Sequence, residues 1–176
     1  MSKILFRTLL SGILAGIVYV IFFILHFVPV FENAQFFSIF LFTATITLLY
    51  STRQRFGAGK YLGLLLLICI FYPVIFPFRV SYLQKVFYYG LYFSTLSFTP
   101  HLWRKFFKNS TVLNNTVCAL DILITGICIS SLLYPIMGYS VQFSVFFIDT
   151  ALRFTCIAIG ILLTTFFYDP KIKFSK

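Results

Sequence analysis

The sequence predicts an all-α integral membrane protein, a single domain over residues 1–176 built as a bundle of about six transmembrane helices with both termini on the cytoplasmic side. Apolar residues make up 60% of the chain and charged residues 10%, which is more hydrophobic surface than a soluble domain of this length can bury. The 25 Phe and 11 Tyr residues suit a bundle interior and the headgroup zone. The apolar residues also gather in runs near the roughly 20 residues that a membrane-crossing helix needs.

The N-terminal half of the chain contains the first three expected spans. Residues 8–30 carry no Asp, Glu, Lys or Arg, and this run is too long for a cleavable signal, so we expect a retained span. After a polar turn, residues 34–50 form a shorter span whose threonine hydroxyls can bond to helix carbonyls. Residues 51–60 are expected to be a basic loop with two glycines, and residues 61–78 a span that closes at two prolines.

The C-terminal half contains the other three. The fourth apolar run is short, so we extend this span to residues 80–100 and expect Lys85 to snorkel or to face the bundle. Residues 101–115 are basic and aromatic, which is typical of an interfacial segment. Residues 116–137 are the fifth span. The sixth, residues 141–168, is about 28 residues long and must tilt or begin in the interface.

The positions of Lys and Arg predict the orientation of the bundle. The net charge is +10, but the cations lie at the ends of the spans, which excludes a nucleic-acid surface and favours contact with anionic lipid headgroups. We therefore expect a bilayer with anionic headgroups on the basic side and other membrane subunits as partners, in a bacterial inner membrane or, alternatively, an organelle membrane. Eleven cations fall on the side of the termini and two on the other, namely Lys3, Arg7, Arg53, Arg55, Lys60, Arg104, Lys105, Lys108, Lys171, Lys173 and Lys176 against Arg79 and Lys85.

Two opposite charges inside the sixth span are the sharpest feature of the sequence. Asp149 and Arg153 are four residues apart, which places them on one face of a helix. A lipid-facing charge near the bilayer centre costs about 2.5–3.5 kcal/mol, so the pair should face protein or water. The pair is either a structural salt bridge or part of a substrate site, to which His26 at the outer end of the first span is a candidate contributor.

Two further features concern packing inside the bundle. Asp121 lies near the start of the fifth span without a cation three or four residues away, so it contacts a loop cation or becomes protonated. In the first span a strip of small residues predicts close packing of another helix, within the chain or across a homodimer; the strip consists of Ser11, Gly12, Ala15 and Gly16.

The sequence gives no support to catalysis. The four carboxylates and two histidines lie at different expected depths, and neither a GxSxG nor an HExxH motif is present. The four cysteines stand in apolar surroundings without metal-ligand spacing. We therefore expect no enzyme, no metal and no cofactor.

Two main functions fit these observations. The first is a subunit that binds or transports a small solute at a polar site around Asp149, Arg153 and His26. The second is a non-catalytic scaffold or assembly subunit of a larger membrane complex, and a third class, an immunity protein, fits by size and basicity alone. A ligand-sized cavity of about 300 Å³ or more beside the pair would favour the first function, and a sealed pair the second.

Overall fold

The computed structural model describes residues 2–28, 32–75, 81–106, 111–136 and 141–168. This part of the chain is all-α, which confirms the predicted fold class. It contains no strand, and its helices are α1 (Ser2–Ile24), α2 (Asn33–Phe56), α3 (Ala58–Ile75), α4 (Tyr82–Phe106), α5 (Thr111–Leu133) and α6 (Phe143–Tyr168).

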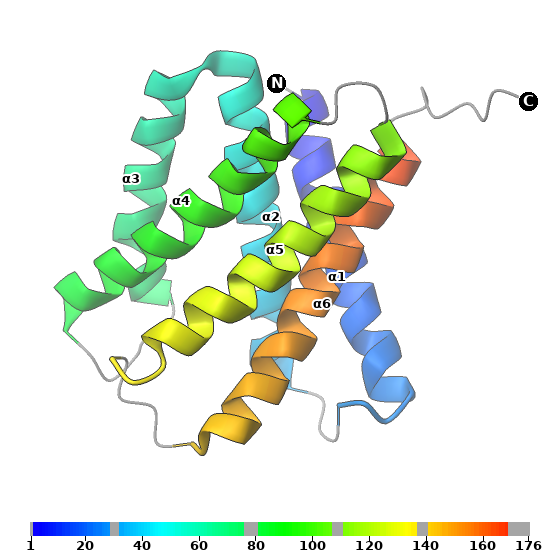
Figure 1. Cartoon of the computed structure of the whole chain (residues 1–176), viewed down its shortest axis with the longest axis vertical. Coiled ribbons are helices and arrows are strands. Elements are labelled where there is room, and N and C mark those ends of the chain that lie inside the picture. The colour runs from blue at the N-terminus through cyan, green and yellow to red at the C-terminus, as the bar shows by residue number, and fades with distance from the viewer. Residues whose placement is uncertain (1, 29–31, 76–80, 107–110, 137–140, 169–176) are drawn as a thin grey trace, which may run out of the picture.

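Successive helices run in opposite directions, so the start of α1 and the end of α6 lie at the same end of the bundle (Figure 1). We call this the terminal end and the other the distal end. Helix α1 packs between α2 and α6, α5 packs between α4 and α6, and α3 packs against α2 and α4. Five helices, all except α4, are long and apolar enough to cross a membrane. The chain is therefore a multi-pass membrane protein.

Helix α4 is long enough to cross but more polar than its neighbours. Its 25 residues correspond to about 37 Å of helix. Two of its hydroxyl groups find partners on adjacent helices: Ser97 shares a hydrogen bond of 2.8 Å with Tyr61 of α3, and Tyr92 shares one with Ser130 of α5. A helix between two others can carry such residues because its polar groups are satisfied inside the protein.

Aromatic side chains from four helices fill the centre of the bundle. Phe93 of α4 is fully buried, and its ring centroid lies 4.7 Å from that of Phe42 on α2 and 4.8 Å from that of Tyr72 on α3. Phe154 of α6 stacks on Tyr92 at 6.0 Å. These rings bury large apolar areas and fix the spacing of the helices.

Small residues of α1 allow α2 to approach closely. The Ser11 hydroxyl donates to the Thr47 hydroxyl oxygen at 2.9 Å. A Cβ atom on Gly12 would lie 2.8 Å from the ring of Phe40, and one on Gly16 would lie 2.7 Å from the ring of another α2 phenylalanine. Both distances are shorter than van der Waals contact, so larger residues would push the helices apart.

Another face of the same strip packs against α6. A Cβ atom on Gly160 would lie 2.6 Å from the Cβ of Ala15 and 2.7 Å from its backbone. Ala15 is fully buried. The strip on α1 therefore serves packing within the chain on two sides.

The helices differ from the expected spans mainly at the terminal end. The expected loop at 51–60 was wrong, because α2 continues to Phe56 and only Gly57, at φ 82°, separates it from α3. Arg and Gln are good helix formers, and a glycine with positive φ ends a helix at little cost. The expected interfacial segment at 101–115 is also largely helical, since it holds the end of α4 and the start of α5.

Helix α1 is displaced toward the N-terminus relative to the expected span at 8–30. It begins at Ser2, because long cationic side chains in its first turns can extend to the interface while the helix continues. It ends at Ile24, where the backbone turns and the N–H of Phe27 donates to the carbonyl of Phe22 at 2.9 Å.

Candidate functional site

Asp149 and Arg153 form the ion pair that their spacing predicts. Arg153 Nη2 lies 2.8 Å from Asp149 Oδ2, and the two side chains are 36% and 38% exposed for Arg153 and Asp149 respectively. The pair is thus neutralised within one helix and open on one side, so the sealed pair that would favour a scaffold is not found.

The pair lies in the first half of α6, toward the distal end. The helix has 26 residues from Phe143, so Asp149 and Arg153 are about 9 Å and about 15 Å along an axis of about 39 Å. At this position a charged group is costly wherever lipid covers it. The exposed side of the pair therefore requires water or another protein.

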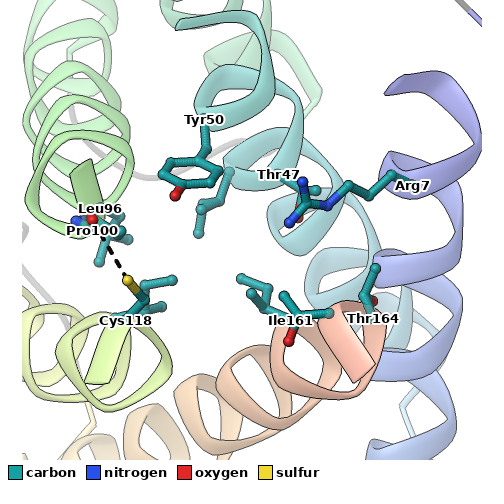
Figure 2. Close-up of a pocket in the computed structure, with 11 residues that line it drawn as sticks. Arg7, Thr47, Tyr50, Leu96, Pro100, Cys118, Ile161 and Thr164 are labelled. Carbon is teal, nitrogen blue, oxygen red and sulfur yellow. Dashed lines mark hydrogen bonds between the residues drawn. The ribbon is translucent and has the colours of Figure 1, made fainter. Parts of the chain in front are cut away.

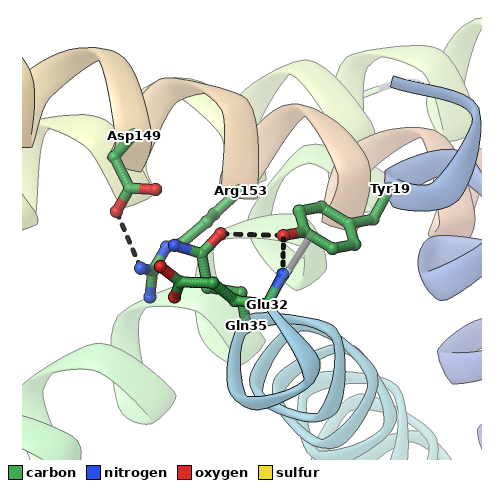
Figure 3. Close-up of polar contacts among 5 residues, drawn as sticks. All are labelled: Tyr19, Glu32, Gln35, Asp149 and Arg153. Atoms are coloured by element: carbon green, nitrogen blue, oxygen red, sulfur yellow. Dashed lines mark hydrogen bonds and ion pairs between the residues drawn. The ribbon is translucent and has the colours of Figure 1, made fainter. Parts of the chain in front are cut away.

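Helices α1 and α2 add polar groups beside the pair (Figure 3). The Tyr19 hydroxyl donates to Gln35 Oε1 at 3.0 Å and accepts the backbone N–H of Glu32 at 3.4 Å. The charges of Glu32, Asp149 and Arg153 all act on that hydroxyl. We call Tyr19, Glu32, Gln35, Asp149 and Arg153 the distal polar cluster; it holds one guanidinium and two carboxylates.

Local structure explains how these residues meet. Tyr19 is 2% exposed in the last turns of α1, and Glu32 precedes the first residue of α2 with an extended backbone and no side-chain capping bond. Gln35 follows in the first turn of α2. The short connection between antiparallel α1 and α2 therefore brings the three together at the distal end.

One donor of the cluster is left for an external group. The Nε atom of Arg153 is buried and has no hydrogen-bond partner among the described residues, while Nη2 is used by Asp149. A buried donor without an acceptor is unfavourable. An acceptor supplied from outside the described residues would satisfy it.

His26, the third residue proposed for this site, is not joined to it by any hydrogen bond or ion pair in the part of the chain described. It lies in the turn after α1, is exposed, and has φ 60°. Tyr19, Glu32 and Gln35 were missed as site residues, because their meeting depends on how α1 and α2 pack. The one available signal was Glu32, a rare acid just before the second span.

Asp121 lies on α5, away from the distal polar cluster. The Thr125 hydroxyl donates to its Oδ1 at 3.3 Å, and its Oδ2 is buried without a hydrogen-bond partner among the described residues. Within those residues Asp121 forms no ion pair, so its contact is a neighbouring hydroxyl of its own helix.

A partly enclosed cavity, drawn in Figure 2, lies in the terminal half of the bundle. Its volume is about 40 Å³, well below the roughly 300–1,000 Å³ of small-molecule pockets. Arg7, Thr47, Tyr50 and Thr164 bring polar groups to a mostly apolar wall. An open groove of about 330 Å³ lies near it at the terminal end. Asp149 and Arg153 line neither space.

Metal ligands do not gather in the part of the chain described: it contains no group of three His, Cys, Asp or Glu side chains placed to hold an ion. Of the four free cysteines, Cys128 is exposed and the other three are buried. No protein family model matches the sequence, and no curated protein or solved structure is similar enough to match it. The function must therefore be argued from the geometry of this chain.

Proposed function

We propose that this multi-pass membrane protein is a non-catalytic assembly subunit, which binds another membrane protein over the distal polar cluster. The observation that carries the proposal is the Asp149–Arg153 pair, joined at 2.8 Å within α6 and more than one third exposed on both side chains. The pair needs no ligand for charge balance. Its exposed side must nevertheless contact something other than lipid acyl chains.

A partner helix with polar side chains fits this requirement. Covering the pair removes the cost of facing acyl chains, and a carbonyl, hydroxyl or carboxylate of the partner would accept the hydrogen bond that the buried Arg153 Nε does not make among the described residues. Interfaces between membrane helices gain stability from packing and hydrogen bonds of this kind.

The volumes of the described cavities support assembly over carriage. The partly enclosed cavity of about 40 Å³ is too small for a metabolite. The larger groove lies at the opposite end from the distal polar cluster. A solute site around Asp149 and Arg153 would need a pocket that neither space provides.

The experiment compares particle masses after mild extraction from native membranes. The wild-type chain should migrate as a stoichiometric complex heavier than one chain. The variant Asp149→Leu/Arg153→Leu removes both charges together, so it should stay folded, because neither charge of the pair is left without the other. It should migrate as a single chain.

The charge-exchanged variant Asp149→Arg/Arg153→Asp is the matched control. It keeps an ion pair between positions four residues apart, and it tests whether binding of the partner depends on which of the two positions carries the positive charge. A wild-type protein that migrates as a single chain would contradict the assembly role. So would a double-Leu variant that keeps the full mass of the complex.

Small-solute binding is the second candidate, and one observation favours it. Four polar side chains from three helices, and that of Glu32 just before α2, converge in the distal polar cluster. One guanidinium between two carboxylates suits a zwitterionic solute that contacts both signs of charge. A wild-type protein that purifies alone and gains thermal stability with a zwitterionic metabolite, while the double-Leu variant does not, would support this candidate.

A further inference from the structure

An open groove lies at the terminal end, between the start of α1 and the end of α2. The groove has a volume of about 330 Å³, at the lower end of the range for ligand pockets. Three of the residues that line it are cations, and no carboxylate of the described residues lines it; the lining consists of Lys3, Ile4, Arg7, Ser51, Gln54 and Arg55.

Helical spacing explains why these residues share the groove. Lys3 and Arg7 are one turn apart on α1, and Ser51, Gln54 and Arg55 occupy positions i, i+3 and i+4 on α2. The intervening Arg53 points elsewhere. Its guanidinium carbon lies 4.1 Å from the ring centroid of Phe98 on α4. One face of α1 and one face of α2, each with at least one cation, therefore meet at the groove.

The wall of the groove contains a buried hydroxyl without a partner. Ser51 is only 6% exposed, and its Oγ forms no hydrogen bond with the described residues. Buried hydroxyls in proteins are almost always hydrogen-bonded. Since Ser51 lines the groove, an anion seated there would accept its hydrogen bond.

We propose that this groove binds a phosphate group, and that its occupant is the headgroup of an anionic phospholipid. Guanidinium groups bind phosphate oxygens through paired hydrogen bonds, and an ammonium adds a point charge. The apolar neighbours on α1 favour a lipid over a soluble anion: Leu5 and Phe6 are 59% and 58% exposed beside the cations, where acyl chains would lie. This inference stands independently of the proposed assembly role.

The test measures binding to the purified full-length chain in detergent by native mass spectrometry. Three probes are titrated: short-chain phosphatidic acid, phosphatidylcholine with the same chains, and inorganic phosphate. Phosphatidic acid should bind more tightly than phosphatidylcholine, with inorganic phosphate bound only at far higher concentration. If inorganic phosphate binds as tightly as phosphatidic acid, the phosphate site stands and its occupant is a soluble phosphate.

Three variants distinguish a built site from general attraction to a basic surface. Lys60 is an exposed cation at the same end that does not line the groove, so Lys60→Gln is the matched control for Arg55→Gln. General attraction weakens binding about fivefold for each charge removed, wherever it lies near the surface. A built site predicts a loss of about tenfold or more for Arg55→Gln, since a charge-assisted hydrogen bond is lost.

Ser51→Ala changes no charge and should weaken binding of phosphatidic acid several-fold without lowering the unfolding midpoint. The proposal is overturned if Ser51→Ala binds like the wild type, if Arg55→Gln and Lys60→Gln lose equal affinity, or if phosphatidic acid binds no better than phosphatidylcholine. The unfolding midpoints of all three variants should equal that of the wild type. A loss of affinity in Arg55→Gln or Ser51→Ala then reflects a lost contact in the groove and not a loss of folding.

Discussion

The two ends of the bundle differ in the signs of the charged groups that they bring together. At the distal end, Arg153 has its counterion four residues away at 2.8 Å, and Glu32 adds a second carboxylate nearby. At the terminal end, three cations line one groove without a carboxylate from the described residues. The charges at the distal end are therefore of both signs, and the charges that line the groove at the terminal end are all positive. This asymmetry is the one expected if the terminal end faces anionic lipid.

The largest expected effect comes from leaving one charge of the distal pair without its partner. Arg153→Leu should lower the free energy of unfolding by about 2.5–3.5 kcal/mol, the cost of an uncompensated charge within a membrane helix. Asp149→Leu/Arg153→Leu should regain most of that stability. Thermal unfolding in detergent measures both. Equal stability of the single and double variants would mean that the pair is not neutralised within α6.

A second variant, which forces α1 and α6 apart, tests whether the two ends of the bundle depend on each other. In Gly160→Ala the new Cβ would lie 2.7 Å from the Ala15 backbone, so a helix must shift at a cost of about 1–3 kcal/mol. Gly63 has open space around its Cα, so Gly63→Ala should leave the unfolding midpoint nearly unchanged or slightly raised.

The same pair of glycine variants sharpens the comparison through binding. The groove is lined by residues of α1 and α2 alone, and neither Gly160 nor Ala15 is among them, so Gly160→Ala should keep phosphatidic acid binding within about twofold of wild type. The distal polar cluster, which draws on α6, should lose its complex. Loss of lipid binding in Gly160→Ala would show that the two ends are coupled.

A smaller effect is expected from the hydroxyl that links α1 to α2 at the distal end. Tyr19→Phe removes hydrogen bonds to Gln35 and to the Glu32 backbone. The loss of each bond should lower the free energy of unfolding by about 0.5–1.5 kcal/mol. Chemical unfolding in detergent measures the loss. A variant as stable as the wild type would show that Tyr19 contributes only its ring.

Salt should produce the smallest change in stability and still distinguish the ends. Raising ionic strength from about 0.05 M to about 0.5 M shortens the screening length several-fold, so phosphatidic acid binding at the exposed groove should weaken. The difference in stability between wild type and Arg153→Leu should change little, because the distal pair is in direct contact. Salt-independent lipid binding would contradict the role of Lys3, Arg7 and Arg55.

The sequence predicted the fold class correctly, and the reason is the length and spacing of its apolar runs. It also predicted the geometry of Asp149 and Arg153, because a four-residue spacing fixes contact within a helix. Helix ends were less predictable: Ser51 was assigned to a loop, yet it lies inside α2 on the wall of the groove. Helix propensity carried α2 beyond its apolar run.

The meeting of Tyr19 with Gln35 could not be predicted from spacing, because it depends on the packing of two helices. The same applies to Lys3 and Arg55, which are distant in sequence and line one groove. Local rules therefore predicted contacts within helices and the close packing of another helix on the small residues of α1, but the three-dimensional structure was needed to identify which residues meet between helices.

The most direct test of the account is whether the two charged ends face opposite sides of one membrane. In a variant without native cysteines, Gly59→Cys marks the terminal end, and Ser81→Cys and Val141→Cys mark the distal end on either side of α4 and α5. A membrane-impermeant thiol reagent added to intact cells should label positions 81 and 141 but not 59. Labelling of position 59 from outside, or of only one distal position, would contradict the account.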